Sequence, residues 1–319
     1  ALYGPSGNEG KVQAWILAYL REKQIDAHTD ALGNIIAKVG GSGKKLVFSA
    51  HMDTVGVMLT EIDKDGYGKF TAIGWLDPAS IAHTPVRFEN GTVAAICIRD
   101  DKVGKELKVG DLYLDFGTGS KEETEQLVTV GDSAAFVPRF VESKNRILST
   151  FLDNRAGCAI LLQALDQMKN LKNEVYYVFS VQEEVGTRGG QVTAQRIQPD
   201  IGVAVDVTPC HDRPGDLEGS NALDHGVAIK ISDTGSISDE GLVNKSIALC
   251  KEHNVPYQKD VIYVGGTDAG AMTLVGGGIK TIGFSVVTRY THGPNAIVSQ
   301  KDIEATVKML ELFMNADFE

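Results

Sequence analysis

From residue 152 to the end of the chain, short apolar runs alternate with segments of helical periodicity. The apolar runs predict strands at residues 174–181, 201–207, 227–231, 258–264 and 281–286. The intervening segments predict helices at residues 154–168, 185–197 and 240–253, and a last helix from residue 299 past residue 314. Strands that alternate with helices need crossover connections, which place helices on both faces of a sheet. The alternation therefore predicts an α/β fold, with helices on both faces of a mixed sheet.

The first 56 residues also combine a segment of helical periodicity with apolar runs. Apolar residues recur at helical spacing behind residue 12, and residues 33–39 and 45–50 read as strands. The second strand is a continuous apolar run, which is typical of a strand buried on both faces. The segments Ser6-Gly7-Asn8-Glu9 and Ser299-x-x-Asp302 read as capping boxes that open helices. We expect residues 1–56 and 144–319 to form one discontinuous domain around a single sheet.

Between residues 57 and 143 the pattern changes to short alternating segments broken by glycine, aspartate and proline. Residues 92–98 and 134–141 are examples, and only residues 121–126 suggest one short helical turn. This pattern predicts an all-β module. Because sheet-forming segments lie on both sides of it in the chain, we expect residues 57–143 to be an inserted domain.

The net charge limits the kinds of partner that the protein can bind. The 319 residues include 31 basic and 42 acidic side chains, a net charge of −11, whereas nucleic-acid surfaces need clustered lysine and arginine. No apolar run approaches the roughly 20 residues that span a bilayer, and no basic-then-apolar leader opens the sequence. The cysteines form no CxxC pair and fit a reducing compartment; they are Cys97, Cys158, Cys210 and Cys250. We therefore expect no nucleic-acid or membrane partner and a cytoplasmic location.

Acidic and imidazole side chains follow several of the predicted strands. In an open α/β sheet, ligands bind at the carboxyl ends of the strands, so these side chains should meet at one edge. The candidates after strands are His51 and Asp53, then Asp153, then Glu183 and Glu184, then Asp206, and finally His292.

Each candidate alone has an ordinary structural explanation. A single histidine at a strand end is more often hydrogen-bonded than metal-bound, and an aspartate before a helix is usually an N-cap. Two adjacent carboxylates after a buried strand, as at Glu183 and Glu184, would repel each other and lose solvation unless a cation lies nearby. Two histidines with aspartate and glutamate are the donor mix of zinc, cobalt or manganese sites.

Several motifs occur together in a fixed order. They are Ala50-His51-Met52-Asp53, Leu152-Asp153-Asn154-Arg155-Ala156-Gly157-Cys158, Val181-Gln182-Glu183-Glu184-Val185-Gly186, Ala204-Val205-Asp206-Val207-Thr208, Gly265-Gly266-Thr267-Asp268-Ala269-Gly270 and Thr288-Arg289-Tyr290-Thr291-His292. With these motifs in this order, the chain resembles the M42 family of metallo-aminopeptidases over nearly its whole length. The family is also known as the tetrahedral aminopeptidases and includes glutamyl aminopeptidases. The resemblance implies a zinc-peptidase-like catalytic domain with an inserted all-β dimerisation domain.

The resemblance also implies two divalent metal ions for each subunit, zinc or cobalt, with manganese as a further option. Asp153 would bridge both metals; His51 and Asp206 would complete one site, and Glu184 and His292 the other. Glu183 would be the general base, and Asp53 would orient the His51 imidazole. Peptide hydrolysis needs an activated water and stabilisation of the carbonyl oxygen, both of which a metal pair supplies. A base must keep a free oxygen to take the proton, so Glu183 cannot also be a ligand.

The implied function is release of single residues from the free N-terminus of peptides. The implied assembly is a homo-oligomer, a dodecamer built from dimers. Two alternatives remain at this point. One is a metal-dependent deacylase or carboxypeptidase of the related M20 kind, and the other is a metal-binding scaffold without activity. The all-β character of residues 57–143 favours the M42 reading over M20, and the presence of Glu183 counts against an inactive scaffold. Among the other histidines, His211 is close enough to Asp206 in sequence to be a candidate for the substrate pocket.

Overall fold

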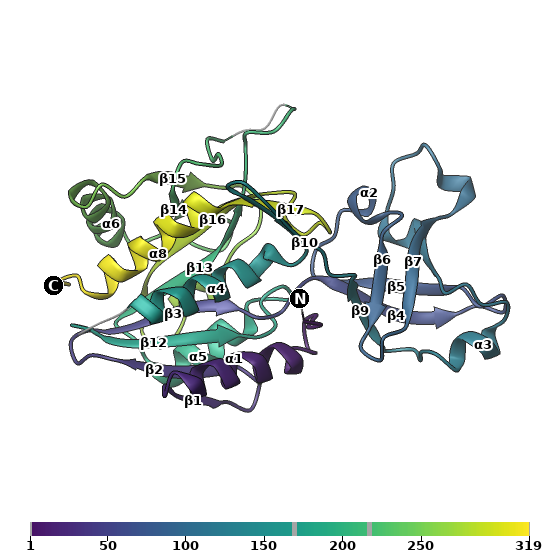
Figure 1. Ribbon diagram of the computed structural model, residues 1–319, viewed down its shortest axis with the longest axis horizontal. Helices are drawn as coiled ribbons and strands as arrows, with labels where there is room; N and C mark the ends of the chain where they lie inside the picture. The colour runs from purple at the N-terminus through teal and green to yellow at the C-terminus, as the bar shows by residue number, and fades with distance from the viewer. Residues whose placement is uncertain (1, 168–170, 216–218, 319) are drawn as a thin grey trace.

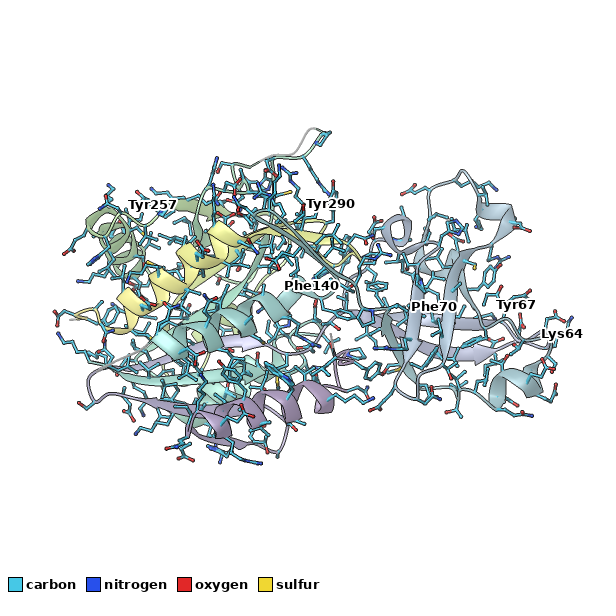
Figure 2. The ribbon with its side chains drawn as sticks, in the orientation of Figure 1. Lys64, Tyr67, Phe70, Phe140, Tyr257 and Tyr290 are labelled. Atoms are coloured by element: carbon cyan, nitrogen blue, oxygen red, sulfur yellow. The ribbon has the colours of Figure 1, made fainter. Side chains whose placement is uncertain are left out.

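The computed structural model describes residues 2–167, 171–215 and 219–318. The chain forms two parts, a large mixed sheet covered by helices and a closed β-barrel at one end of it (Figure 1). Lys64 and Tyr67, in the turn between two barrel strands, mark the end of the barrel that lies farthest from the sheet (Figure 2).

The large sheet contains eleven strands within the described residues, and its four central strands, β12, β3, β13 and β16, are parallel. The main path runs in the order β1-β2-β12-β3-β13-β16-β17-β11-β10, and β14 and β15 branch from β16. The strands are β1 (Asp26–Thr29), β2 (Ile35–Gly40), β3 (Lys45–His51), β10 (Phe140–Ser143), β11 (Arg146–Ser149), β12 (Glu174–Ser180), β13 (Ile201–Pro209), β14 (Val227–Ser232), β15 (Tyr257–Val261), β16 (Lys280–Arg289) and β17 (Ala296–Ser299).

Helices pack on both faces of this sheet. Alternate residues of β3 point to opposite faces, so Phe48 joins one apolar core and Val47 joins the other. The first core includes residues of α1 (Gly10–Glu22), α4 (Leu152–Gln167), α6 (Glu240–Glu252) and α8 (Gln300–Met314). The second includes residues of α5 (Arg188–Ile197) and α7 (Asp268–Thr273). No helix in the described ranges is both long and apolar enough to cross a membrane.

The barrel has its own strands and its own apolar core. It closes in the order β4-β5-β8-β7-β6-β9, and Leu59, Phe88 and Leu114 lie in its interior. Its elements are β4 (Gly56–Ile62), β5 (Gly68–Ile73), α2 (Pro78–Ile81), β6 (Pro85–Phe88), β7 (Val93–Ile98), η1 (Asp100–Lys102), η2 (Val109–Asp111), β8 (Leu112–Asp115), α3 (Lys121–Glu125) and β9 (Ser133–Phe136). Strand β10, at the end of the expected 57–143 insertion, pairs with β11 in the large sheet.

The predicted fold class, a mixed α/β sheet with an inserted all-β part, is confirmed. Some element limits differ from the sequence prediction. Helix α5 begins at Arg188 because residues 182–187 form a loop, and β1, α2 and α7 were not expected. The predicted end of the helix at Met168 lies outside the described residues.

Both predicted capping boxes are wrong, although a helix follows each of them. The Ser6 hydroxyl donates to the Asp53 carboxylate at 2.7 Å, and the Ser299 hydroxyl donates to Asp224 at 2.6 Å. The Asp302 carboxylate accepts from the backbone N–H groups of Asp224 and Gly226. The physical reason is burial, since a buried carboxylate that lacks a hydrogen-bond donor is costly and these long-range contacts provide the donors.

Candidate functional site

Seven acidic and imidazole side chains meet at the carboxyl ends of the parallel strands. His51 is the last residue of β3, Asp206 lies in β13, and the others lie in the segments that follow β11, β12, β3 and β16. The structure brings together every site residue expected from the sequence, namely His51, Asp53, Asp153, Glu183, Glu184, Asp206 and His292. The parallel directions of the central strands explain the convergence, because parallel strands end at the same edge of the sheet.

Asp153 lies at the centre of the cluster. Its Oδ1 is 3.1 Å from His51 Nε2, and its Oδ2 is 3.1 Å from His292 Nε2. His51 Nε2 is also 3.6 Å from Asp206 Oδ1, and His292 Nε2 is 3.2 Å from Glu184 Oε2. Two groups of possible metal ligands therefore share Asp153: one contains His51 and Asp206, and the other contains Glu184 and His292.

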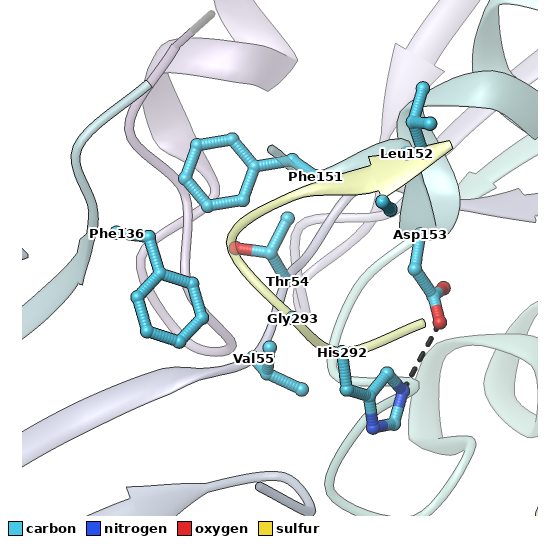
Figure 3. A pocket seen from close by; sticks show the side chains of 9 residues that line it. Thr54, Val55, Phe136, Phe151, Leu152, Asp153, His292 and Gly293 are labelled. Atoms are coloured by element: carbon cyan, nitrogen blue, oxygen red, sulfur yellow. Dashed lines mark ion pairs between the residues drawn. The ribbon is translucent and has the colours of Figure 1, made fainter. Parts of the chain in front are cut away.

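One wall of the site comes from the barrel side of the molecule. Figure 3 shows Asp153 and His292 on one side of a small pocket and Phe136 on the other, with Thr54 and Val55 between them. Phe136 ends the last barrel strand, so the two parts of the chain meet next to the acidic cluster.

Each imidazole is held through its other ring nitrogen. His51 Nδ1 lies 3.1 Å from the Asp53 backbone carbonyl, and His292 Nδ1 lies 2.9 Å from the Trp75 backbone carbonyl. A carbonyl oxygen only accepts, so each Nδ1 carries the hydrogen. In a neutral imidazole this leaves the Nε2 lone pair facing Asp153, which suits a cation between them.

The comparisons with known proteins agree with this geometry. Residues 33–309 match the family model described as M42 glutamyl aminopeptidase. The chain belongs to the M42 family of peptidases. A relative in Acetivibrio thermocellus is 38% identical over 310 residues, which cover 97% of this chain and 94% of that protein.

Two solved structures share both fold and sequence with this M42 peptidase. The aminopeptidase of the archaeon Desulfurococcus kamchatkensis is 30% identical with a TM-score of 0.94, over 99% of this chain and 92% of that one. The Pyrococcus horikoshii TET1 peptidase, which can assemble into a tetrahedron or a large octahedral shell, is 28% identical with a TM-score of 0.87, over 98% of this chain and 95% of that one. The expected family and the expected enzyme class are confirmed: this chain is an aminopeptidase, in a metal-dependent family.

The M42 site contains more buried carboxylates than positively charged side chains that could balance them. Burial raises the pKa of Glu183 well above its usual value, and burial also raises the pKa of Glu184 and of Asp206. Burial alone would lower the pKa of His292, but its hydrogen bonds to Asp153 and Glu184 outweigh this effect and raise the pKa to about 11. The carboxylates therefore attract protons strongly when no other cation is present.

Asp53 connects several parts of the site. It is fully buried, and its Oδ1 lies 3.5 Å from His51 Nδ1. Its two carboxylate oxygens also accept from the backbone N–H groups of Glu183, at 3.0 Å, and Glu184, at 3.2 Å. Burial alone would raise the pKa of Asp53, but the hydrogen bonds from His51, Ser6 and Glu183 lower it. Asp53 is therefore ionised and fixes both an imidazole and the loop after β12.

Two features near the site were not assigned to it from the sequence. The Trp75 carbonyl is a backbone atom, so no side-chain pattern could indicate it. Asp268 lies in the Gly265-Gly266-Thr267-Asp268-Ala269-Gly270 motif, but it was not among the site residues expected from the sequence. In the structure it is buried behind the site, where Ser49 and Ser180 each donate to its Oδ2 at 2.6 Å.

The remaining histidines are outside both candidate metal groups. His211 Nδ1 accepts from the Asn221 backbone N–H at 3.3 Å, which holds its own loop together. The other four histidines are all exposed, namely His28, His83, His225 and His253.

Proposed function

We propose that this aminopeptidase works with a pair of divalent cations bridged by Asp153. The observation that carries the proposal is the division of the Asp153 carboxylate, which presents one oxygen to each imidazole at 3.1 Å. His51 and Asp206 would hold one cation, and Glu184 and His292 the other.

Two further observations fit a metal pair. Glu184 Oε1 is buried and has no hydrogen-bond partner, which is costly for a carboxylate oxygen unless a ligand takes it up. The donors are imidazole nitrogens and carboxylate oxygens, the set preferred by zinc, cobalt and manganese. Divalent charge also balances the excess of buried carboxylates.

Glu183 is the general base in this proposal. A metal pair supplies an activated water and stabilises negative charge on the scissile carbonyl oxygen. The Glu183 carboxylate takes the proton of the attacking water and returns it to the leaving amine. Burial raises the pKa of Glu183 well above its usual value, which helps this carboxylate to accept the proton in the first transfer. Its Oε2 lies 3.8 Å from His51 Nε2, outside both ligand groups.

The proposed substrate is the free N-terminus of a peptide. A carboxylate-rich site can hold a protonated α-amine, which fixes the scissile bond one residue into the chain. The M20-like alternative would act on acyl groups or C-termini instead, and the inactive scaffold would not turn over any substrate.

Paired chromogenic and peptide substrates test the proposed selectivity. The expected result is release of single residues from free N-termini and none from the same peptides after N-acetylation. Equal cleavage of both would favour the deacylase reading, and no cleavage of any member of a full aminoacyl panel would favour the scaffold.

We also propose that the chain divides into a catalytic domain and an inserted barrel that pairs with a second copy. The barrel has a separate core and is joined to the catalytic sheet at β4 and β9, so the sheet does not depend on it. The similarity to a peptidase that assembles into a tetrahedron supports a dodecamer built from such dimers.

A further inference from the structure

We propose that Glu9 and Ser6 are positioning residues that hold the loop carrying Glu183 and Glu184. This inference rests on the proposed roles of those two glutamates. It concerns how the N-terminal segment of the chain, residues 6–9, fixes their backbone.

Three successive backbone N–H groups of the loop are captured by two buried carboxylates. The Gln182 N–H donates to Glu9 Oε1 at 3.2 Å. The next two, of Glu183 and Glu184, donate to Asp53 Oδ1 and Oδ2. Ser6 then donates its hydroxyl to the same Asp53 Oδ2 at 2.7 Å. The N-terminal segment thus acts on the loop directly through Glu9 and indirectly through Ser6.

The loop needs these contacts because its conformation is unfavourable on its own. Gln182 has φ +55°, in the left-handed region that side chains other than glycine rarely adopt. The other side of the loop is already bonded, since its carbonyls accept from the N–H groups of residues 186, 187 and 188. The N–H groups of residues 182, 183 and 184 bond instead to the carboxylates of Glu9 and Asp53.

Because Glu9 and Asp53 are buried, these carboxylates and the loop stabilise each other. Glu9 is 7% exposed and also accepts from the Gly7 N–H at 2.8 Å. Burying a carboxylate is costly unless it receives charge-assisted hydrogen bonds, so Glu9 and Asp53 depend on the loop amides as the loop depends on them. Arg155, whose Nε donates to the Met52 carbonyl at 2.9 Å, adds positive charge close to both carboxylates.

The arrangement explains why Ser6 and Glu9 resemble a capping box without forming one. The Glu9 side chain binds the loop after β12, and the Ser6 side chain binds Asp53. Even Asp53, the nearer partner in sequence, is more than 40 positions away. A small displacement of this loop would move the base and a metal ligand together, and supporting residues of this kind typically change metal affinity or activity by about 10–100-fold.

Hydrogen exchange at the loop amides is the direct test, because it reads the proposed hydrogen bonds without depending on activity. Glu9→Ala should accelerate exchange of the Gln182 amide at least tenfold, and Ser6→Ala should accelerate that of Glu184 with less effect on Gln182. Exchange rates of amides inside β12 should be unchanged in both variants, and this result would show that the fold is intact. Glu9→Gln keeps an acceptor oxygen and should restore protection at Gln182.

Kinetics and metal affinity form the second arm. Glu9→Ala should lower kcat about tenfold with KM changed less than twofold, and should weaken binding of zinc measured by calorimetry. Asn8→Ala is the matched control, because Asn8 belongs to the same segment but donates to Ser133 of the barrel at 3.1 Å. It should leave exchange of the loop amides, kcat and zinc affinity unchanged.

The inference is overturned if Glu9→Ala and Ser6→Ala leave the loop amides as protected as Asn8→Ala does. It is also overturned if Glu9→Gln loses as much protection of the Gln182 amide as Glu9→Ala does. These outcomes are distinct from failure of the proposed function, in which the unaltered protein binds no metal pair or cleaves no free N-terminus while the exchange results stand.

Discussion

Glu183 and Glu184 are neighbours in sequence but have different surroundings. The Glu184 side chain is 3% exposed, and its Oε2 lies 3.2 Å from His292 Nε2. The Glu183 side chain is 10% exposed and lies on the His51 side of the cluster. A turn after β12 therefore directs the two carboxylates to different partners, which is the basis for separating base from ligand.

Substitution should separate the two roles. Glu183→Gln should retain both metals and lower kcat by about 100- to 10,000-fold, the range for removal of a general base. Glu184→Gln should instead weaken one of the two metal sites. Metal analysis by mass spectrometry, together with kcat, checks both expectations. Loss of a metal from the Glu183 variant with a full complement in the Glu184 variant would reverse the assignment.

We expect Asp268 to make the stability of the protein depend on pH. Burial raises its pKa from 3.8 to about 6, although Ser180 and Ser49 donate to it. Because the folded-state pKa is the higher one, the stabilising contribution is full below pH 3.8 and is lost as the pH rises through about 6. The shift corresponds to about 3 kcal/mol between those limits.

Asp268→Asn removes this titration and keeps the size of the side chain. The melting temperature of the variant, relative to that of the unaltered protein, should therefore increase by a few degrees between pH 4 and pH 7. Thermal denaturation of metal-free protein at several pH values measures it. A difference that stays constant with pH would show that Asp268 does not change its protonation state in this range.

At the scale of elements, the loop between β5 and α2 links the barrel to the metal site. Gly74 has φ +75°, and a Cβ there would lie 2.9 Å from Val55 Cγ1 and 3.3 Å from Glu184 Cβ. The next residue, Trp75, offers its carbonyl to His292. Close approach of this loop to the site thus requires glycine at position 74.

Gly74→Ala should therefore displace the loop and weaken metal binding, by about 10–100-fold if the His292 contact is lost. Gly91→Ala is the control, because Gly91 has φ +96° and no atom within 4 Å of its would-be Cβ. Both variants carry a similar backbone penalty, on the order of 1–2 kcal/mol. Calorimetric titration with zinc distinguishes them, and equal affinities would mean that the loop does not support the site.

The sequence predicted the large sheet well because its central strands are continuous apolar runs, such as Val203 to Val205, that only a doubly covered sheet can bury. It did not indicate β1, whose residues Asp26 to Thr29 are mostly exposed and show no alternation. Helix α7 was also missed, since its six residues are too few to show a repeating helical pattern of apolar residues.

The candidate site was predictable where function resides in side chains at strand ends, as with His51 and Asp206. It was not predictable where a backbone carbonyl or a distant segment supports those side chains. The Trp75 carbonyl and the Glu9 contact both depend on chain segments brought together only by folding. For the same reason the capping-box pattern at Ser6 was misleading, because local pattern contains no information on long-range partners.

For the whole molecule, the proposed assembly depends on surfaces that a single chain leaves open. On the barrel, Val103 is 65% exposed and Val130 is 60% exposed. On edge strand β10, Phe140 is 64% exposed (Figure 2). The open edge of β10 and these exposed apolar side chains are features that pairing with a second copy would protect.

Light scattering of metal-loaded protein at micromolar concentration should give twelve chain masses, with dimers as the smaller species when metal is removed. The mass of a single chain under metal-loaded conditions would contradict both the cage and the pairing role of the barrel.

The central claim, a catalytic metal pair bridged by Asp153, is tested most directly by titrating chelator-treated protein with metal while following release of residues from a free N-terminus. The account predicts no activity without metal, recovery with zinc, cobalt or manganese, and a plateau at two equivalents per chain. Asp153→Asn should bind neither ion tightly and should not recover. Full activity in extensively dialysed, metal-free protein, or a plateau at one equivalent, would contradict the claim.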